Sequence, residues 1–182
     1  MALTRRKLLL NIVAGFGAAG MLALIFPFLR GMLPTLKNSE ARVIDISSLK
    51  DGELKTVRWK GKNVLIVKRN PESISKRPSQ LKSLIDPFSL NSLQPEFAEG
   101  HGRSSRENHL VVYSYCTLFS CELKRLEIIG KESNVFDGFF CPCDGSRYDT
   151  SGRVISGSAA QHNLSIPNYE HISEGLIRLT GA

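Results

Sequence analysis

The sequence predicts a membrane-anchored β protein, in which one N-terminal transmembrane helix precedes a head of short strands. Three observations lead to this prediction. Residues 8–29 form an uncharged apolar run of 22 residues. Short alternating segments separated by turn residues recur through residues 42–182, which is typical of a sandwich or barrel. All four cysteines lie within residues 116–143, which indicates one local site and not a disulfide-dense scaffold.

Composition limits the function classes that the chain can belong to. Its 182 residues allow one ordinary domain with an appendage. With 42% hydrophobic and 23% charged residues, it is not a disordered tail, a collagen-like fibre or a multi-span membrane protein. The net charge of +7 is divided into +4 for residues 1–41 and +3 for the remainder. Much of the excess therefore flanks the apolar run, and we do not expect nucleic acid as a partner.

The apolar run is long enough to be a membrane anchor. Its 22 residues would form a helix of about 33 Å, which spans a hydrocarbon core of about 30 Å. The apolar region of a cleaved secretory signal is shorter, about 7–15 residues. A buried core helix is the alternative interpretation, and the gap-free apolarity of the run on all faces disfavours it. We therefore predict an uncleaved signal-anchor within residues 1–30.

Arg5 and Arg6 stand directly before the anchor. Paired arginines followed by apolar residues are typical of a twin-arginine export signal. Ordinary positive-inside flanking charge is the alternative interpretation. Both interpretations leave the N-terminus in the cytoplasm. We expect a single-pass protein of a bacterial-type inner (cytoplasmic) membrane, with its head on the periplasmic side.

The first part of the head contains predicted strands in quick succession. Residues 31–41 mix Gly, Pro, Ser and Asn, which predicts a flexible linker. Residues 42–46 alternate as a short strand, and residues 55–69 form a predicted hairpin that turns at 60–63. Apolar residues near the end of 71–87 suggest a short helix there, and the polar, turn-rich residues 86–106 a surface loop.

The second part of the head contains the cysteines and further turns. Residues 110–115 form a predicted strand that leads directly into Cys116. Residues 148–154 predict a hairpin around Ser151-Gly152, and residues 171–179 predict another around 173–175.

The cysteine spacing is C-x4-C, a gap of 19 residues, then C-x-C. Each pair follows a strand-like segment, so two neighbouring loops could clamp a metal, and thiolates suit zinc or iron–sulfur. The spacing differs from the C-x2-C of zinc ribbons. Two structural disulfides in an exported domain fit the spacing equally well, so the metal and disulfide interpretations stay open. A thiol–disulfide module is disfavoured, because C-x-x-C is absent.

The residues around the cysteines resemble a known family, the Rieske iron–sulfur subunit of ubiquinol–cytochrome c reductase (cytochrome bc) complexes. That family carries the boxes C-T-H-L-G-C and C-P-C-H-G-S, which read C-T-L-F-S-C at 116–121 and C-P-C-D-G-S at 141–146 here. The resemblance covers nearly the whole chain. It includes Asp86-Pro87, Gln94-Pro95, Arg103-Ser104, Asp137-Gly138-Phe139-Phe140 and Ser146-Arg147-Tyr148-Asp149.

The resemblance implies an antiparallel Rieske-type sandwich over residues 42–182, with a smaller cluster-binding lobe at about 110–160. It implies a [2Fe–2S] cluster whose thiolate ligands are Cys116 and Cys141. It further implies a disulfide between Cys121 and Cys143. The two hydroxyls that tune the cluster in the family fall at Ser146 and Tyr148. The implied partners are the cytochrome b and cytochrome c1 subunits.

The chain departs from the family at the cluster itself. The family's two imidazole ligands fall at Leu118 and Asp144. Leucine has no ligand atom, and a carboxylate is a hard ligand at a site built for imidazole. Ser120 replaces a glycine, and the family's Gly-Pro-Ala-Pro loop is Gly-Ser-Ala-Ala at residues 157–160. The chain's histidines all lie outside both boxes, at His101, His109, His162 and His171.

Two functions follow from this mixture of agreement and departure. The first is a Rieske-type subunit without a standard cluster, structural or regulatory in role. The alternative is an active electron-transfer subunit with an atypical cluster, ligated by Asp144 or by Cys121 or Cys143. The family is part of an oxidoreductase, but no residue of this chain is assigned as catalytic. Without iron, we expect Cys116 and Cys141 to form a second disulfide after a modest loop shift.

Overall fold

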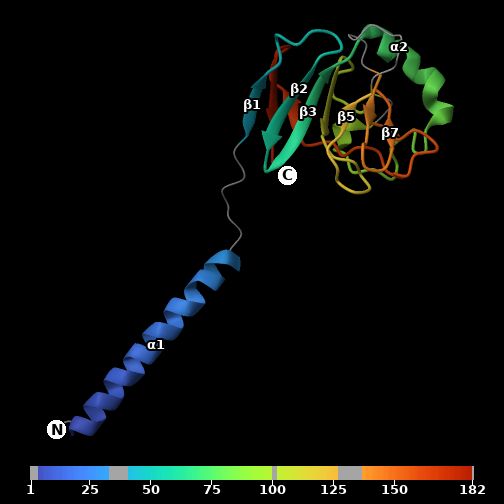
Figure 1. The fold of residues 1–182 in the computed structure, drawn as a ribbon. Helices are drawn as coiled ribbons and strands as arrows, with labels where there is room; N and C mark the ends of the chain where they lie inside the picture. The colour runs from blue at the N-terminus through green and yellow to red at the C-terminus, as the bar shows by residue number, and fades with distance from the viewer. Residues whose placement is uncertain (1–3, 33–40, 100–101, 127–136, 182) are drawn as a thin grey trace. The chain divides into compact units, whose positions relative to one another are not determined.

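The computed structural model describes residues 4–32, 41–99, 102–126 and 137–181. Internal contacts divide the chain into two compact units, Met1–Asn38 and Ser39–Ala182. The first unit contains helix α1 (Arg5–Met32), and the second is the head (Figure 1). The predicted linker at 31–41 falls mostly on residues outside the described ranges, although Gly31 and Met32 still belong to α1.

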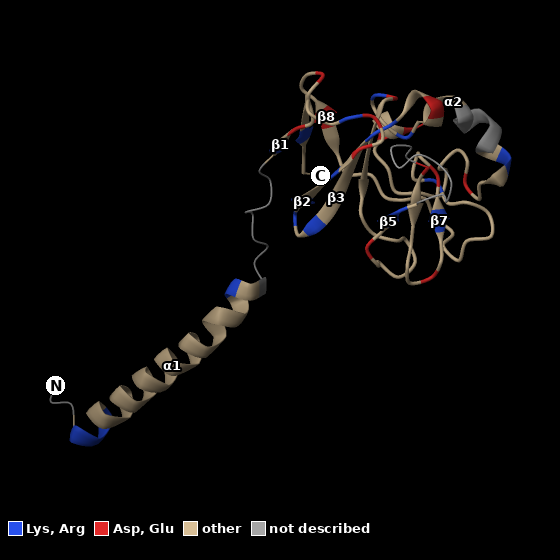
Figure 2. Cartoon of the chain, turned by 45° about the horizontal axis from the view of Figure 1, so that its top comes forward, with Lys and Arg blue, Asp and Glu red and all other residues tan. Residues whose placement is uncertain are grey.

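Helix α1 is apolar around its whole circumference. The described side chains of the helix, at residues 5–31, are all exposed, and its membrane-like window has a mean hydropathy of 2.2. Basic residues occupy both ends, with Arg5, Arg6 and Lys7 at the start and Arg30 in the last turn (Figure 2). Within the described residues, α1 is the one helix long and apolar enough to cross a membrane.

The described part of the head contains three antiparallel sheets of three strands each. The first has the order β1-β9-β8, the second β2-β3-β4 and the third β5-β6-β7. The strand bounds are β1 Arg42–Asp45, β2 Leu54–Trp59, β3 Lys62–Lys68, β4 His109–Tyr113, β5 Lys124–Arg125, β6 Phe139–Phe140, β7 Arg147–Tyr148, β8 Tyr169–His171 and β9 Leu176–Leu179. These antiparallel sheets, which follow one N-terminal apolar helix in the sequence, confirm the predicted fold class.

The hairpin of β2 and β3 is tighter than predicted. Only Lys60 and Gly61 form the turn, with φ of 47° and 78°. Two successive residues in the left-handed region match the twist of the flanking strands, so Lys62 and Asn63 join β3. The predicted hairpin at 171–179 is confirmed by the pairing of β8 with β9.

The core is built on the central strand β3. Its residues 64–67 are all buried, which is expected of a strand covered on both faces. Leu110, Val111 and Val112 of β4 are also buried beside it. Strand β4 then continues toward the first cysteine loop, and Tyr115 forms an isolated bridge with Glu122 across the base of that loop.

The helix predicted near the end of residues 71–87 is misplaced. The structure places α2 at Pro71–Gln80, followed by a short 3-10 turn at Leu81–Ser83. Pro71 occupies the first helical turn, where its missing N–H costs nothing. Leu84 is buried and pairs with Ile155 as an isolated bridge, so tertiary pairing and not helix formation uses this apolar side chain. The turn-rich segment 86–106 is irregular apart from a 3-10 turn at Glu96–Ala98.

Three fully buried arginines surround the turn that follows β7. This turn lies within the predicted hairpin at 148–154, whose strands meet through one bridge between Tyr148 and Val154. Arg69 donates to Thr150 O at 2.9 Å and to Glu107 O at 2.8 Å. Arg153 forms an ion pair with Asp149 at 2.7 Å. Thus two cationic side chains already fix both ends of one short turn.

Arg103 completes this group of buried cations. Its guanidinium donates to the carbonyl oxygens of Ser151, Gly152 and Leu164, and also to the side chain of Gln94. Burial lowers the pKa of Arg103 to about 10, which still leaves the group charged at neutral pH. Ser151, Gly152 and Leu164 are buried with it, and Gly152 O also accepts from Leu164 N–H. Removing the guanidinium would therefore take its N–H donors from the carbonyls of Ser151 and Leu164.

We predict that Arg103→Met destabilises the head by about 3 kcal/mol or more, because several buried acceptors lose their partner at once. The matched control is Arg178→Met, which removes an exposed ion pair with Glu170 and should cost less than about 1 kcal/mol. Urea unfolding of the full chain in detergent, followed by tryptophan fluorescence, measures both. Equal losses in the two variants would contradict the assigned role of Arg103.

One buried and one half-buried histidine form a second group. His109, at the start of β4, is only 4% exposed, and its ring centroid lies 5.5 Å from that of His171. Nδ1 of His109 and both ring nitrogens of His171 have no hydrogen-bond partner among the described residues. Burial, and to a lesser extent the charges of His171, Lys68, Arg106 and Arg69, lower the pKa of His109 to about 4. Burial also lowers the pKa of His171.

We predict that the head loses stability as the pH falls from about 6.5 to about 4. The folded state favours the neutral ring of His109, so its contribution is complete above the unfolded pKa of about 6.5 and is lost toward the folded value. The loss should be about 1–3 kcal/mol. Unfolding free energies measured across this range should fall less steeply in His109→Phe, whereas the exposed control His162→Gln should follow the parent. Parallel profiles for parent and His109→Phe would disprove the assignment.

Candidate metal centre

Two cysteine loops of the same backbone design face each other in the head. In the first, Cys116 N–H donates to Cys121 O at 2.8 Å, and Ser120 N–H donates to Cys116 O at 3.0 Å. In the second loop, Cys141 N–H donates to Ser146 O at 2.8 Å, and Gly145 N–H donates to Cys141 O at 3.0 Å. Each loop is therefore closed by a cysteine that both donates and accepts a backbone hydrogen bond.

Each closed loop needs one residue in the left-handed region, four positions after its first cysteine. Gly145 fills this position in the second loop with φ of 74°. Ser120 fills it in the first loop with φ of 56°, although only glycine adopts this conformation without steric cost. The first loop thus keeps the shape of the second despite a less suitable residue.

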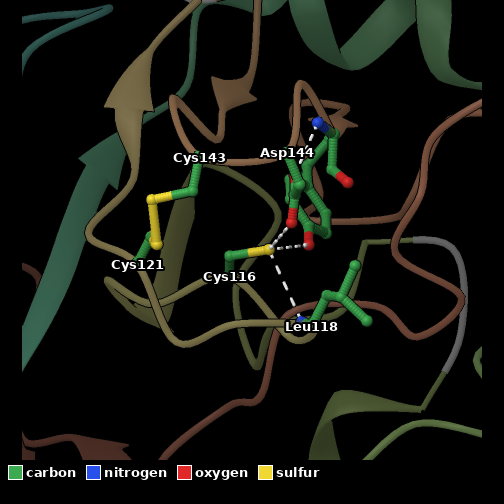
Figure 3. The surroundings of a disulfide bond; sticks show 7 residues. Cys116, Leu118, Cys121, Cys143 and Asp144 are labelled. Atoms are coloured by element: carbon green, nitrogen blue, oxygen red, sulfur yellow. Dashed lines mark hydrogen bonds between the residues drawn. A yellow bond between two sulfur atoms is a disulfide. The ribbon is translucent and has the colours of Figure 1, made fainter.

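A disulfide joins the two loops. Cys121 and Cys143 are bonded, with their Cα atoms 6.4 Å apart (Figure 3). This confirms the pairing that the resemblance implies. The bond links residues 22 positions apart, so it fixes the first loop against the second independently of any metal.

Cys116 and Cys141 are both buried and both free. The expected second disulfide is therefore wrong for this structure. Cys116 Sγ instead donates to Asp144 Oδ2 at 3.0 Å, and the closed loops hold each cysteine backbone in place. The two sulfurs and one carboxylate oxygen of Asp144 all lie within 4.8 Å of one another. The structure thus brings together two predicted thiolate positions and one of the two predicted imidazole positions.

Asp144 points toward Cys116 from the second loop (Figure 3). Its Oδ1 accepts from Ser146 N–H at 2.8 Å, while Oδ2 accepts from the Cys116 thiol. Burial disfavours the ionised carboxyl, but hydrogen bonds from Cys116, Ser146 and Cys141 outweigh burial and lower its pKa to about 2. Burial raises the pKa of the Cys141 thiol. At neutral pH the Asp144 carboxyl is therefore ionised, and the Cys141 thiol is protonated.

The two predicted hydroxyls lie in different surroundings. Tyr148 Oη lies 3.3 Å from Cys116 Sγ and 3.1 Å from Thr117 Oγ1, so it contacts the first cysteine loop from strand β7. Burial raises the pKa of Tyr148, and its contact with Cys116 raises it further. Ser146 Oγ instead accepts from Ala160 N–H at 2.9 Å and so holds the neighbouring loop.

Thr117 is a site residue that the sequence analysis missed. Its hydroxyl donates to His162 O at 2.7 Å, which ties the first cysteine loop to the segment before Asn163. Its position inside the first cysteine box was the available signal. A threonine hydroxyl, however, has too many ordinary surface roles to be singled out without the fold.

Leu118 occupies the remaining imidazole position. Its side chain is 43% exposed and has no ligand atom, and only its backbone N–H approaches Cys116 Sγ, at 3.5 Å. Among the described residues, no histidine belongs to either group of candidate ligands. The residues present therefore do not fit a standard cluster held by two thiolates and two imidazoles.

Two closed cysteine loops, joined by a disulfide and mounted on an antiparallel head, define a Rieske-type protein. Curated relatives named ubiquinol–cytochrome c reductase iron–sulfur subunit are similar to this sequence over nearly its whole length. The relative from Allochromatium vinosum is 33% identical over 95% of this chain and 86% of its own length. The relative from Blastochloris viridis is 36% identical over 97% of this chain and 92% of its own length. The chain belongs to the family of ubiquinol–cytochrome c reductase iron–sulfur subunits.

Two further comparisons add little. No family model matches the sequence. Among solved structures, a chain of a hyperthermophilic respiratory complex III has a TM-score of 0.47 at 19% identity, covering 91% of this chain and 96% of that chain. This likeness is too weak to bear on the fold.

We predict that Cys121→Ala/Cys143→Ala destabilises the head by about 3 kcal/mol, because the unfolded chain regains the freedom of a loop of this length. Thermal unfolding of the full chain with and without reductant measures the effect. Reduction should lower the midpoint of the parent and leave the double variant unchanged. An unfolding midpoint of the parent that does not respond to reductant would contradict the prediction.

Proposed function

We propose that this chain is the Rieske-type subunit of a ubiquinol–cytochrome c reductase-like respiratory complex, and that it serves there without a standard [2Fe–2S] cluster. Its role is then structural or regulatory. Family membership supports the place in the complex. The single observation that supports the loss of the cluster is Leu118, an apolar side chain where the second iron needs a ligand.

The proposal includes the membrane and two protein partners. Helix α1 is the single membrane anchor, and Arg5 and Arg6 at its start favour twin-arginine export, with the head on the periplasmic side of a bacterial-type inner membrane. The cytochrome b and cytochrome c1 subunits are the expected partners, because the curated relatives are subunits of the reductase.

Leu118 also removes a function besides iron ligation. An imidazole at this position can donate a hydrogen bond and titrate near neutral pH, which couples electron transfer to proton transfer. An isobutyl side chain does neither. The Leu118 side chain, which is exposed at this tip, therefore provides no group to bond a quinol or to accept its proton.

The position of Asp144 favours a second candidate function. Its carboxylate lies within 4.8 Å of both free cysteine sulfurs, so an atypically ligated cluster has three protein ligands available in place. Such a subunit would still transfer electrons, at a potential altered by carboxylate ligation. Measuring the iron content of the purified chain distinguishes the two candidate functions.

We predict that the full chain, expressed in a host that assembles iron–sulfur clusters, contains near-zero iron and acid-labile sulfide. The matched control is Leu118→His/Asp144→His, which restores both imidazoles and should gain about two irons and a Rieske-type electron paramagnetic resonance signal after reduction. Two irons per chain and a rhombic signal in the parent would instead establish the atypical cluster. A parent and control that both lack iron would show that the scaffold itself no longer accepts a cluster.

A further inference from the structure

We propose that Cys116, Cys141 and Asp144 form a site for a single zinc ion, with a fourth coordination position left open. The inference rests on the proposed function, since a [2Fe–2S] cluster would use the same two thiolates. Two thiolates and one carboxylate provide three protein ligands, which is the number found in zinc sites that retain an open position.

The distances suit one metal ion. The three ligand atoms lie within 4.8 Å of one another, and Cys116 Sγ and Asp144 Oδ2 are 3.0 Å apart. In a tetrahedral zinc site with bonds of about 2.3 Å to sulfur, two thiolates lie about 3.7 Å apart. A displacement of about 1 Å at most therefore brings the two sulfurs to this spacing. Zinc would take the place of the thiol protons of Cys116 and Cys141, including the one that Cys116 now donates to Asp144, and both protons would be released to solvent.

The surroundings hold the three ligands in position. The disulfide of Cys121 with Cys143 connects the two loops that carry them. Ser146 N–H fixes the second oxygen of Asp144, while Tyr148 Oη and Leu118 N–H approach the sulfur of Cys116. Hydrogen bonds of this kind orient ligands and support metal affinity.

The donor set favours zinc over other common divalent ions. Magnesium and calcium prefer six or more oxygen ligands, and the described residues of this group provide one carboxylate. Zinc also binds a given nitrogen, oxygen and sulfur site more tightly than ferrous iron does. Asp144 is half-buried and its neighbours Pro142 and Cys143 are exposed, so the site lies close to the protein surface.

The test is a metal titration of the full chain in detergent, under argon and without reductant. Mass mapping first verifies that Cys121 and Cys143 remain bonded, because their sulfurs lie within 4.8 Å of Cys141 Sγ and would compete as thiols. Cobalt(II) is the spectroscopic probe. We expect one cobalt per chain, thiolate-to-cobalt charge-transfer bands, full displacement by one equivalent of zinc, and protection of Cys116 and Cys141 from alkylation.

Two variants test the ligands, and a third is the matched control. Cys116→Ser should abolish the charge-transfer bands from that sulfur and stoichiometric binding. Asp144→Asn should weaken zinc at least about tenfold, because even loss of an outer-shell partner costs about 10- to 100-fold in affinity. Asp51→Asn changes an exposed carboxylate of the head and should bind as the parent does. Circular dichroism verifies that each variant is folded. If a variant is unfolded, the protection of the parent's cysteines from alkylation still tests the site.

The outcomes separate this inference from the proposed function. Absence of stoichiometric cobalt and zinc, or equal affinity in parent and Asp144→Asn, overturns the zinc site and leaves a cluster-free subunit intact. Iron with acid-labile sulfide in the purified chain overturns both. Stoichiometric zinc that protects both cysteines and depends on Asp144 establishes the site.

Discussion

The head depends on the buried positive charge around the turn at residues 149–153. Arg69, Arg103 and Arg153 are all fully buried there, and they are bonded mostly to backbone carbonyls. A buried guanidinium is tolerated only when its donors are satisfied, so the segments that provide those carbonyls cannot move apart independently. The end of β3, the irregular segment near Gly102 and the strand after the second cysteine loop are thus held as one body.

The cysteine loops inherit their position from this constraint. Tyr148 immediately precedes the turn, and its hydroxyl reaches Cys116 of the other loop. Close packing leaves no room for a side chain at Gly138, since a Cβ there would lie 2.0 Å from Tyr148 O. The disulfide then joins the two loops directly. The disulfide and this packing join the loops through residues other than Leu118 and Asp144, so those two positions can differ from the family's histidines while the surrounding fold persists.

Sequence patterns predicted local elements well where the pattern and the packing agree. The hairpin of β8 and β9 follows from alternation and a turn, and α1 follows from length and apolarity alone. Prediction was wrong for α2, because the apolar residue Leu84 pairs with Ile155, far along the chain. It missed Thr117, whose contacts with Tyr148 and His162 exist only after the chain folds. Long-range partners of this kind leave no periodic trace.

The sequence by itself determined which chemical groups the site can contain: two boxes with four cysteines, an aspartate and a leucine where the family has histidines, and an apolar anchor ahead of them. Only the tertiary structure decided how those groups combine. It bonded Cys121 to Cys143, left Cys116 and Cys141 as buried thiols, and placed the Asp144 carboxylate 3.0 Å from the first of them. Spacing along the chain cannot determine these distances, because they are set by hydrogen bonds and packing between segments more than twenty residues apart.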